Sequence, residues 1–148
     1  MSGPGNTQFS VGVHMATLLA ALGPEPQTSE LLASSAGSNP VHVRRVLGRL
    51  RDAGLVSSRP GPRGGWQLAV DPETTTLAEI WRAVHRDEGV LGVHEASPAC
   101  TVGRRIQDLL SEIDSSAVRA VERDLAGTTL ADLARGARAD EFEPAPAA

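Results

Sequence analysis

The sequence predicts a mainly α-helical protein that carries one small β-hairpin. Apolar residues recur at helical spacing along several segments, which places them on one face of each helix. Two β-prone runs between residues 55 and 70 flank a turn-rich stretch, R-P-G-P-R-G-G, at 59–65. A long apolar stripe follows over residues 101–125. Together these three patterns give the fold class.

The chain has 148 residues, of which 41% are hydrophobic, so it can bury a core as one domain with an extension. No run approaches the ~20 apolar residues that a membrane span needs, and the N-terminus lacks the pattern of a signal peptide. A single cysteine cannot form a disulfide within the chain. We therefore expect a cytoplasmic protein with no membrane partner.

The first helix is predicted over residues 10–22, after a loose stretch over 1–8. The run G-P-E-P at 23–26 marks its end, because proline and glycine interrupt helices. This helix would lead directly into the segment over residues 28–51.

Residues 28–51 predict two short helices joined by a glycine turn. Thr28 can cap the first helix, and Gly37 can end it in the left-handed conformation. Asn39 can cap the second helix, and the proline that follows it suits the first helical position. The buried face of the second helix has apolar residues at i, i+3, i+4 and i+7: Val43, Val46, Leu47 and Leu50. This pattern is a helix-turn-helix.

The hairpin follows this motif directly, with strands predicted over 55–58 and 66–70. The turn between the strands carries Arg59 and Arg63. A tip of this kind can contact a neighbouring groove or phosphate of DNA. The sequence therefore predicts a helix-turn-helix with a wing, which is typical of DNA-binding domains.

The charge distribution supports DNA as the partner, although the net charge is −4. Residues 40–70 contain six Arg and one Asp, which gives +5 there and leaves −9 for the rest of the chain. Every basic residue is arginine, which forms bidentate bonds to phosphate and guanine. The alternative is an ordinary helical hairpin with a solvated arginine face.

The predicted DNA-binding residues lie in both helices of the motif and in the wing. The start of the second helix is expected at base edges, the arginines at bases or phosphates, and the wing-tip glycines close to the DNA backbone. The full set is Thr28, Ser29, Ser38, Asn39, His42, Arg44, Arg45, Arg49, Arg59, Arg63, Gly64 and Gly65.

Residues 53–69, A-G-L-V-S-S-R-P-G-P-R-G-G-W-Q-L-A, resemble the wing signature of the Rrf-two type of bacterial transcription regulators. Segments near 9–20 and 75–84 are similar to that family's first helix and to the helix after its wing. The resemblance is close over about 9–85 and looser over 98–135. It implies a homodimeric winged-helix regulator, and we expect a repressor that binds a pseudo-palindromic operator.

Four parts are expected along the chain. The winged helix-turn-helix domain would cover 9–85, and its last helix, over 77–85, would begin at a capping box of Thr76 and Glu79. An irregular sensor loop is predicted over 86–98. Residues 99–136 would form the dimerisation helix and a short last helix, and 137–148 a disordered tail.

The single cysteine, Cys100, is a candidate sensor. The run S-P-A-C at 97–100 places it at the third position of the predicted long helix. The helix dipole and Arg104, one turn later, both favour the thiolate, which is the reactive form. Oxidation to a sulfenic acid or an intermolecular disulfide would then carry the signal. The alternative is a buried cysteine that packs as a small hydrophobe.

No cofactor or metal is expected. The resemblance implies that cluster-binding relatives use three cysteines in this region, and this chain has one. An iron–sulfur cluster or haem held by Cys100 with His85, His94 or a carboxylate is the alternative. An enzyme is not expected, because the sequence has no catalytic triad, metal-ligand cluster or phosphate-binding glycine loop.

The stripe of the long helix is wide for a domain of this size, and a second copy of the chain is its expected partner. Packing on the first helix of the same chain is the alternative. The predicted dimerisation residues are Ile106, Leu109, Leu110, Ile113, Ala117 and Val121.

The sequence also allows two rival functions. A regulator controlled by a small molecule would need a pocket between the long helix and the winged domain. A winged helix used only for protein contacts would bind DNA weakly and without sequence preference.

Overall fold

The computed structural model describes residues 4–86 and 88–137. In this part of the chain the helices are α1 (Pro4–Leu22), α2 (Ser29–Ala36), α3 (Pro40–Asp52), α4 (Leu77–His85), α5 (Thr101–Leu125) and α6 (Leu130–Ala134). The strands are β1 (Val56–Arg59) and β2 (Gly65–Leu68). The mainly α-helical fold class with one small hairpin is confirmed.

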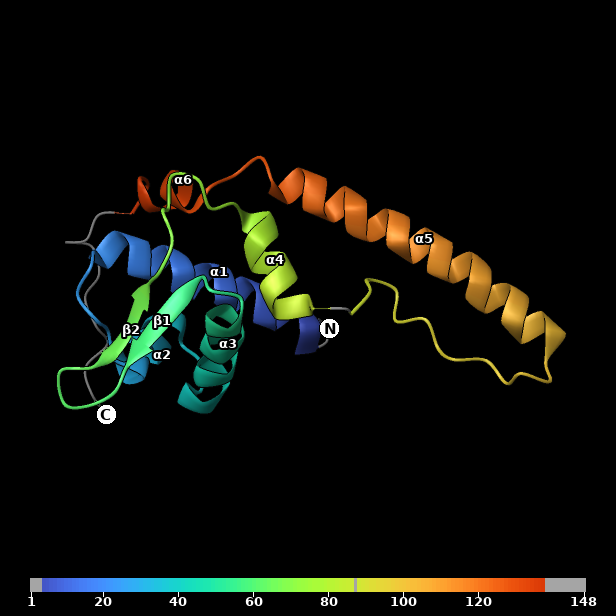
Figure 1. Ribbon diagram of the computed structural model, residues 1–148, viewed down its shortest axis with the longest axis horizontal. Coiled ribbons are helices and arrows are strands. Elements are labelled where there is room, and N and C mark those ends of the chain that lie inside the picture. The colour runs from blue at the N-terminus through green and yellow to red at the C-terminus, as the bar shows by residue number, and fades with distance from the viewer. Residues whose placement is uncertain (1–3, 87, 138–148) are drawn as a thin grey trace.

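A compact body and a projecting arm make up the molecule (Figure 1). The body contains α1 to α4, the hairpin and α6, while α5 extends away from it. The chain between α4 and α5 runs outward along α5 before the helix begins. Side-chain oxygens of α5 hold this segment: Gln107 accepts from the Ala96 amide at 2.8 Å, and Asp114 accepts from the Leu91 amide at 2.6 Å.

The first helix is longer than the sequence predicts. It begins at Pro4 rather than near Ser10, so the expectation of a loose stretch over 1–8 is wrong from residue 4 onward. Proline suits the first turn of a helix. The Phe9 ring packs edge-to-face on Trp81, at 5.4 Å between ring centroids, and this contact fixes the early turns of α1 against α4.

The helix-turn-helix forms as expected around its glycine. Gly37 adopts φ 56° and ψ 32°, and the Ser38 amide donates to the carbonyl of Ala33 at 3.1 Å, which closes α2. The apolar faces of α2 and α3 meet in the core. Their fully buried residues are Leu32, Ala33, Val43, Val46, Leu47 and Leu50.

The wing is an antiparallel pair in which Val56 faces Leu68 and Arg59 faces Gly65. Its strands start and end one or two residues away from the predicted limits. The strand β2 also pairs with Gln27, the residue before the helix-turn-helix, through two backbone bonds of 2.7 and 2.8 Å to Trp66. This second pairing attaches the wing to the start of the motif.

The last helix returns to the body. The Leu130 amide donates to the carbonyl of Thr75 at 2.9 Å, and the Leu130 side chain is fully buried. The predicted capping pair before α4 is present, with the Thr76 amide bonded to the Glu79 carboxylate at 2.7 Å. Except for Ala137, the predicted tail over 137–148 lies outside the described residues. None of the described helices is long and apolar enough to cross a membrane.

His85 ends α4 in a buried aromatic cluster. Its ring stacks on Trp81 at 3.5 Å between centroids, and the residue is only 7% exposed. Within the described structure its Nδ1 atom is buried without a hydrogen-bond partner. Burial lowers the pKa of His85 below its ordinary 6.5, because the charged ring would lose its hydration.

We expect the free energy of unfolding to decrease as the pH falls below 6.5. In that range the unfolded chain binds a proton at His85 that the folded protein binds less readily. One proton allows a slope of at most about 1.4 kcal/mol per pH unit. His85→Phe keeps the stacked ring and should flatten this slope in urea titrations, whereas exposed His94→Gln should not. An unchanged slope in His85→Phe would contradict the assignment.

Candidate nucleic-acid interface

The exposed face of α3 carries polar and basic side chains opposite its buried stripe. Arg45 is exposed and makes no hydrogen bond or ion pair to another described residue. His42 is half-buried on the same side, one turn earlier. Because neither side chain is committed within the protein, both are available to an outside partner. Exposure of these side chains is what a recognition helix requires, and their contact with DNA stays a prediction.

Arg44 is held by the first helix of the motif. Its Nε donates to Ser29 Oγ at 3.1 Å, and its Nη2 donates to Glu30 Oε1 at 3.2 Å. Backbone hydrogen bonding lowers the pKa of Glu30, and Ser29 and Arg44 lower it further. The pair lies at the surface, so its main effect is to orient the guanidinium of Arg44 rather than to stabilise the fold.

Arg49 does not occupy the exposed face. The sequence predicts a phosphate or groove contact for it, but the structure directs its Nη1 to the backbone carbonyl of Val84 in α4. The side chain is half-buried between α3 and α4. Its role is therefore to join the two helices. The sequence could not show this, because helical periodicity gives the direction of a side chain but not its partner.

Three polar residues sit where the helices of the motif begin. Thr28 Oγ1 accepts from the Leu31 amide at 3.2 Å, and Asn39 Oδ1 accepts from the Val41 amide at 2.8 Å. Both are helix caps, as the sequence predicts. The cap leaves the amide group of Asn39 free to donate, and Ser38 lies beside it. These groups lie at the end of α3 that a recognition helix presents to bases.

The wing contributes two exposed arginines, Arg59 at the end of β1 and Arg63 in the turn. The two glycines that follow serve the wing itself. A Cβ on Gly64 would collide with the carbonyl of Arg59, and a Cβ on Gly65 would lie 2.5 Å from the carbonyl oxygen of Gln27. Gly65 also has φ 144°, which side chains rarely allow. The structure thus gives these glycines a role inside the protein, apart from any approach to DNA.

The predicted set leaves out an exposed apolar residue at the start of α3. Val41 lies in the first turn and is 60% exposed. An exposed apolar side chain at this end of a recognition helix can contact the methyl group of thymine. The signal was available in the sequence, because Val41 falls outside the buried spacing that starts at Val43.

The basic elements gather at one edge of the molecule. Figure 1 shows the wing turn and one end of α3 together at the lower edge, on the side away from α5 and α6. Arg51, in the last turn of α3, lies over the Trp66 ring of β2 at 5.8 Å and so joins the recognition helix to the wing. The +5 charge of residues 40–70 is therefore concentrated on one part of the body.

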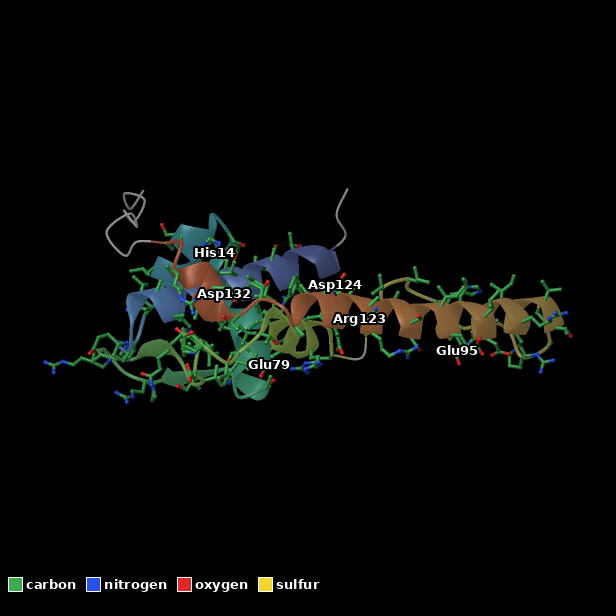
Figure 2. All side chains as sticks on the ribbon, turned by 90° about the horizontal axis from the view of Figure 1, so that it is seen from above. His14, Glu79, Glu95, Arg123, Asp124 and Asp132 are labelled. Atoms are coloured by element: carbon green, nitrogen blue, oxygen red, sulfur yellow. The ribbon has the colours of Figure 1, made fainter. Side chains whose placement is uncertain are left out.

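The arm exposes the stripe that the sequence assigns to a dimer. None of the described side chains of α5 is fully buried. Leu109 is 58% exposed, and Ile106 and Ile113 are also exposed, whereas Leu110, Ala117 and Val121 are half-buried. Figure 2 shows the helix extending from the body, with Arg123 and Asp124 near the body and Glu95 beside its outer part.

Cys100 is exposed at the tip of the arm. It caps α5 instead of occupying the third helical position, because the helix begins at Thr101. Its Sγ accepts from the Gly103 amide at 3.3 Å. The alternative of a buried cysteine is therefore wrong. Arg104 meets Cys100 through a backbone bond of 3.0 Å, and no side-chain contact joins the two among the described residues.

The candidate iron donors of the described residues lie apart from one another. In the described ranges, no three His, Cys, Asp or Glu side chains lie close enough together to hold a metal ion. His85, one of the donors considered above, is buried against Trp81 in the body, whereas Cys100 lies at the tip of the arm.

Known proteins are similar to this chain in sequence and in fold. The model of the Rrf2 family, described as iron-dependent transcriptional regulators, matches residues 5–136. The chain is similar to YwnA of Bacillus subtilis (strain 168), a candidate HTH-type transcriptional regulator. They are 38% identical over 129 residues, which is 86% of this chain and 95% of YwnA.

Solved structures of regulators and DNA-binding proteins also resemble this chain. A crystal structure of a candidate DNA-binding protein has a TM-score of 0.65 and 34% identity, over 85% of this chain and 97% of that one. The structure of CymR, the global cysteine regulator of B. subtilis, has a TM-score of 0.57 and 26% identity, over 93% of this chain and 97% of that one.

The helix-turn-helix, its wing and the long C-terminal helix define a winged-helix transcription regulator. The chain belongs to the Rrf2 family, the Rrf-two type that the wing sequence resembles. Its relatives are transcriptional regulators and not enzymes.

Replacing Arg45 tests the exposed face of α3. Arg45→Ala should weaken binding to a preferred DNA site by about 1–3 kcal/mol and relax its sequence preference, because an uncommitted arginine at this position can read guanine. Arg119→Ala, on an exposed position of α5, is the matched control and should leave binding unchanged. Fluorescence anisotropy on specific and random duplexes measures both effects. Equal affinities for Arg45→Ala and the wild type would contradict the assignment.

Proposed function

We propose that the protein is a homodimeric repressor that binds a pseudo-palindromic operator in double-stranded DNA. The observation that carries this proposal is the uncommitted, exposed Arg45 of α3, in a helix that has one end at the same edge of the molecule as the wing turn (Figure 1). The site offers side chains for bases and side chains for phosphates, which a specific DNA-binding surface needs. Since DNA is the proposed ligand, we expect the protein to act in the cytoplasm.

The proposed contacts divide by position. His42, Arg45, Ser38 and Asn39 would lie near base edges, because they occupy the start of the recognition helix. Arg44, Arg59 and Arg63 would bind phosphates or a groove, while Thr28 and Ser29 would support the backbone contacts of α2. Two recognition helices would enter major grooves about one helical turn apart, or ~34–36 Å.

A second copy is the partner that best accounts for α5. A helix of 25 residues with exposed Leu109, Ile106 and Ile113 presents more apolar surface than a solvated helix needs. Identical stripes on two chains are complementary by symmetry, so a two-fold pair would bury both. A dimer of this kind would also match the two-fold symmetry of the operator.

Cys100 is the proposed point of control. Its exposure allows an oxidant to reach the sulfur, and its position in the arm places the chemistry next to the dimer helix. Oxidation would disturb the bond from the Gly103 amide and with it the start of α5. The chain is also similar to CymR, the global cysteine regulator of B. subtilis, and this similarity supports the proposal of a thiol-related signal.

The first experiment selects a binding site from a library of random duplexes and then measures affinity for the selected duplex at fixed salt. Recovery of a pseudo-palindrome that competitor DNA does not displace is expected. Weak binding, indifferent to sequence, would reject the DNA function in favour of a protein-interaction module.

The dimer is tested on the arm. Leu109→Glu should shift the protein from dimer to monomer in analytical ultracentrifugation, because a charge at the centre of the stripe would have to be desolvated. Ser111→Glu, exposed on the same helix outside the predicted stripe, should remain dimeric. Near-UV circular dichroism of Trp66 and Trp81, which both lie in the body, should be unchanged in both variants, since Leu109 is not part of the monomer core. A dimeric Leu109→Glu would contradict the assigned interface.

The thiol switch is tested by adding hydrogen peroxide. We expect the wild type to lose at least about tenfold in affinity for the selected duplex, and Cys100→Ser to keep its affinity. A loss of affinity that persists in Cys100→Ser would reject the switch. Tight binding that ignores peroxide would instead direct the search for a signal to small molecules.

A further inference from the structure

We propose that Asp52 and Arg86 are positioning residues that set the separation of the two recognition helices in the dimer. Their ion pair joins the end of α3 to the junction from which the arm departs. The proposal rests on the dimeric DNA-binding function above, and it assigns a role to residues that touch neither DNA nor the second copy in that proposal.

The junction has an unusual backbone. Arg86 adopts φ 48° and ψ −119°, and it is the one residue other than glycine with positive φ among those the structure describes. Side chains rarely allow this conformation, so the surrounding structure must impose it. The Arg86 amide donates to the carbonyl of Arg82 at 3.1 Å, and the Glu88 amide donates to the carbonyl of His85 at 2.8 Å. These bonds turn the chain out of α4 in a fixed direction.

The side chain of Arg86 reaches back to the recognition helix. Its Nη2 lies 2.9 Å from Asp52 Oδ2. Asp52 is the last residue of α3, where a carboxylate opposes the helix dipole, and it is the only acidic residue in the +5 stretch over 40–70. Its carboxylate lies between two arginines, because Oδ1 is also 3.7 Å from Nη2 of Arg51, the neighbouring residue. Only the shorter pair with Arg86 reaches beyond α3, so this pair gives Asp52 a structural role between elements.

Two further contacts continue this link. Arg49 in α3 donates to the carbonyl of Val84 in α4, one residue before His85. Arg82 in α4 donates to Glu122 in α5 at 3.1 Å. A continuous series of contacts thus runs from the recognition helix through the end of α4 to the arm.

The side chains involved are not there mainly for stability. Arg86 and Asp52 are 55% and 57% exposed, and an exposed ion pair contributes little to folding. They border a hollow of about 270 Å³ at the surface between α3 and α4. Removing the pair should therefore change geometry more than it changes folding.

The consequence concerns operator spacing. If two arms pair, each recognition helix is placed by the path from α5 through α4 to α3. A rigid path favours one distance between half-sites, and each added base pair moves and rotates a half-site relative to its partner. A loosened path should accept several distances, while each helix still recognises its own half-site.

The test uses the selected duplex and derivatives whose half-sites are one or two base pairs closer together or further apart. We expect the wild type to prefer the selected spacing by about tenfold or more, and Asp52→Asn and Arg86→Gln to reduce that preference to about threefold or less. The exchange variant, Asp52→Arg with Arg86→Asp, should restore it. Arg135→Gln, which breaks an exposed ion pair of 2.6 Å to Glu73 outside this path, is the control and should keep the wild-type preference.

The outcomes separate the two proposals. A wild type with no selected site, or with no spacing preference, overturns the dimeric function and this proposal together. A wild type with a preference that both single variants retain overturns this proposal alone. The proposal is also overturned if Arg135→Gln loses the spacing preference as much as the two single variants do. It is overturned as well if the exchange variant is folded in urea titration but does not restore the preference.

Discussion

The close approach of β2 to the segment before α2 is the constraint on which the functional surface depends. Gln27 and Trp66 exchange two backbone hydrogen bonds, and Gly65 permits them because a Cβ there would meet the carbonyl oxygen of Gln27. Without this approach the hairpin would be joined to the body only through side-chain packing, such as that of Val56 in the core, and a pair of four-residue strands has little stability of its own. The contact also places the wing beside α2 and α3, so bases and flanking phosphates can be reached from one rigid body.

The sequence predicts the parts of this surface that depend on local chemistry. Gly37 and Asn39 act within a few residues of themselves, so their turn and cap follow from residue type. Arg49 and the start of α1 depend on neighbours that are distant in the chain. The carbonyl of Val84 attracts Arg49, and Trp81 fixes Phe9, but neither contact leaves a periodic signal. For Cys100 the prediction is partly local. Its position at the start of α5 is predicted to within a few residues, whereas its exposure depends on how the arm packs and could not be predicted from the sequence.

Body and arm are stabilised in different ways. In the body, α6 and α1 close over a core of aliphatic side chains, and the Phe9, Trp81 and His85 rings fill the space where α4 ends. The arm has no comparable core, and the segment beside it is held by two side-chain bonds, from Gln107 and Asp114. Its order as a helix in solution would depend on burial of its stripe, which links assembly to local folding.

The ion pair between Arg44 and Glu30 would affect how the proposed affinity for DNA depends on salt concentration. In the proposed complex Arg44 would meet a phosphate while it is already paired with a carboxylate, so the arginine would arrive at DNA partly neutralised. Fewer condensed cations are then displaced than the number of arginines at the surface suggests, and affinity falls less steeply with salt. A cell that accumulates potassium after hyperosmotic shock would then keep more of this regulator on the proposed operator than a count of positive charges implies.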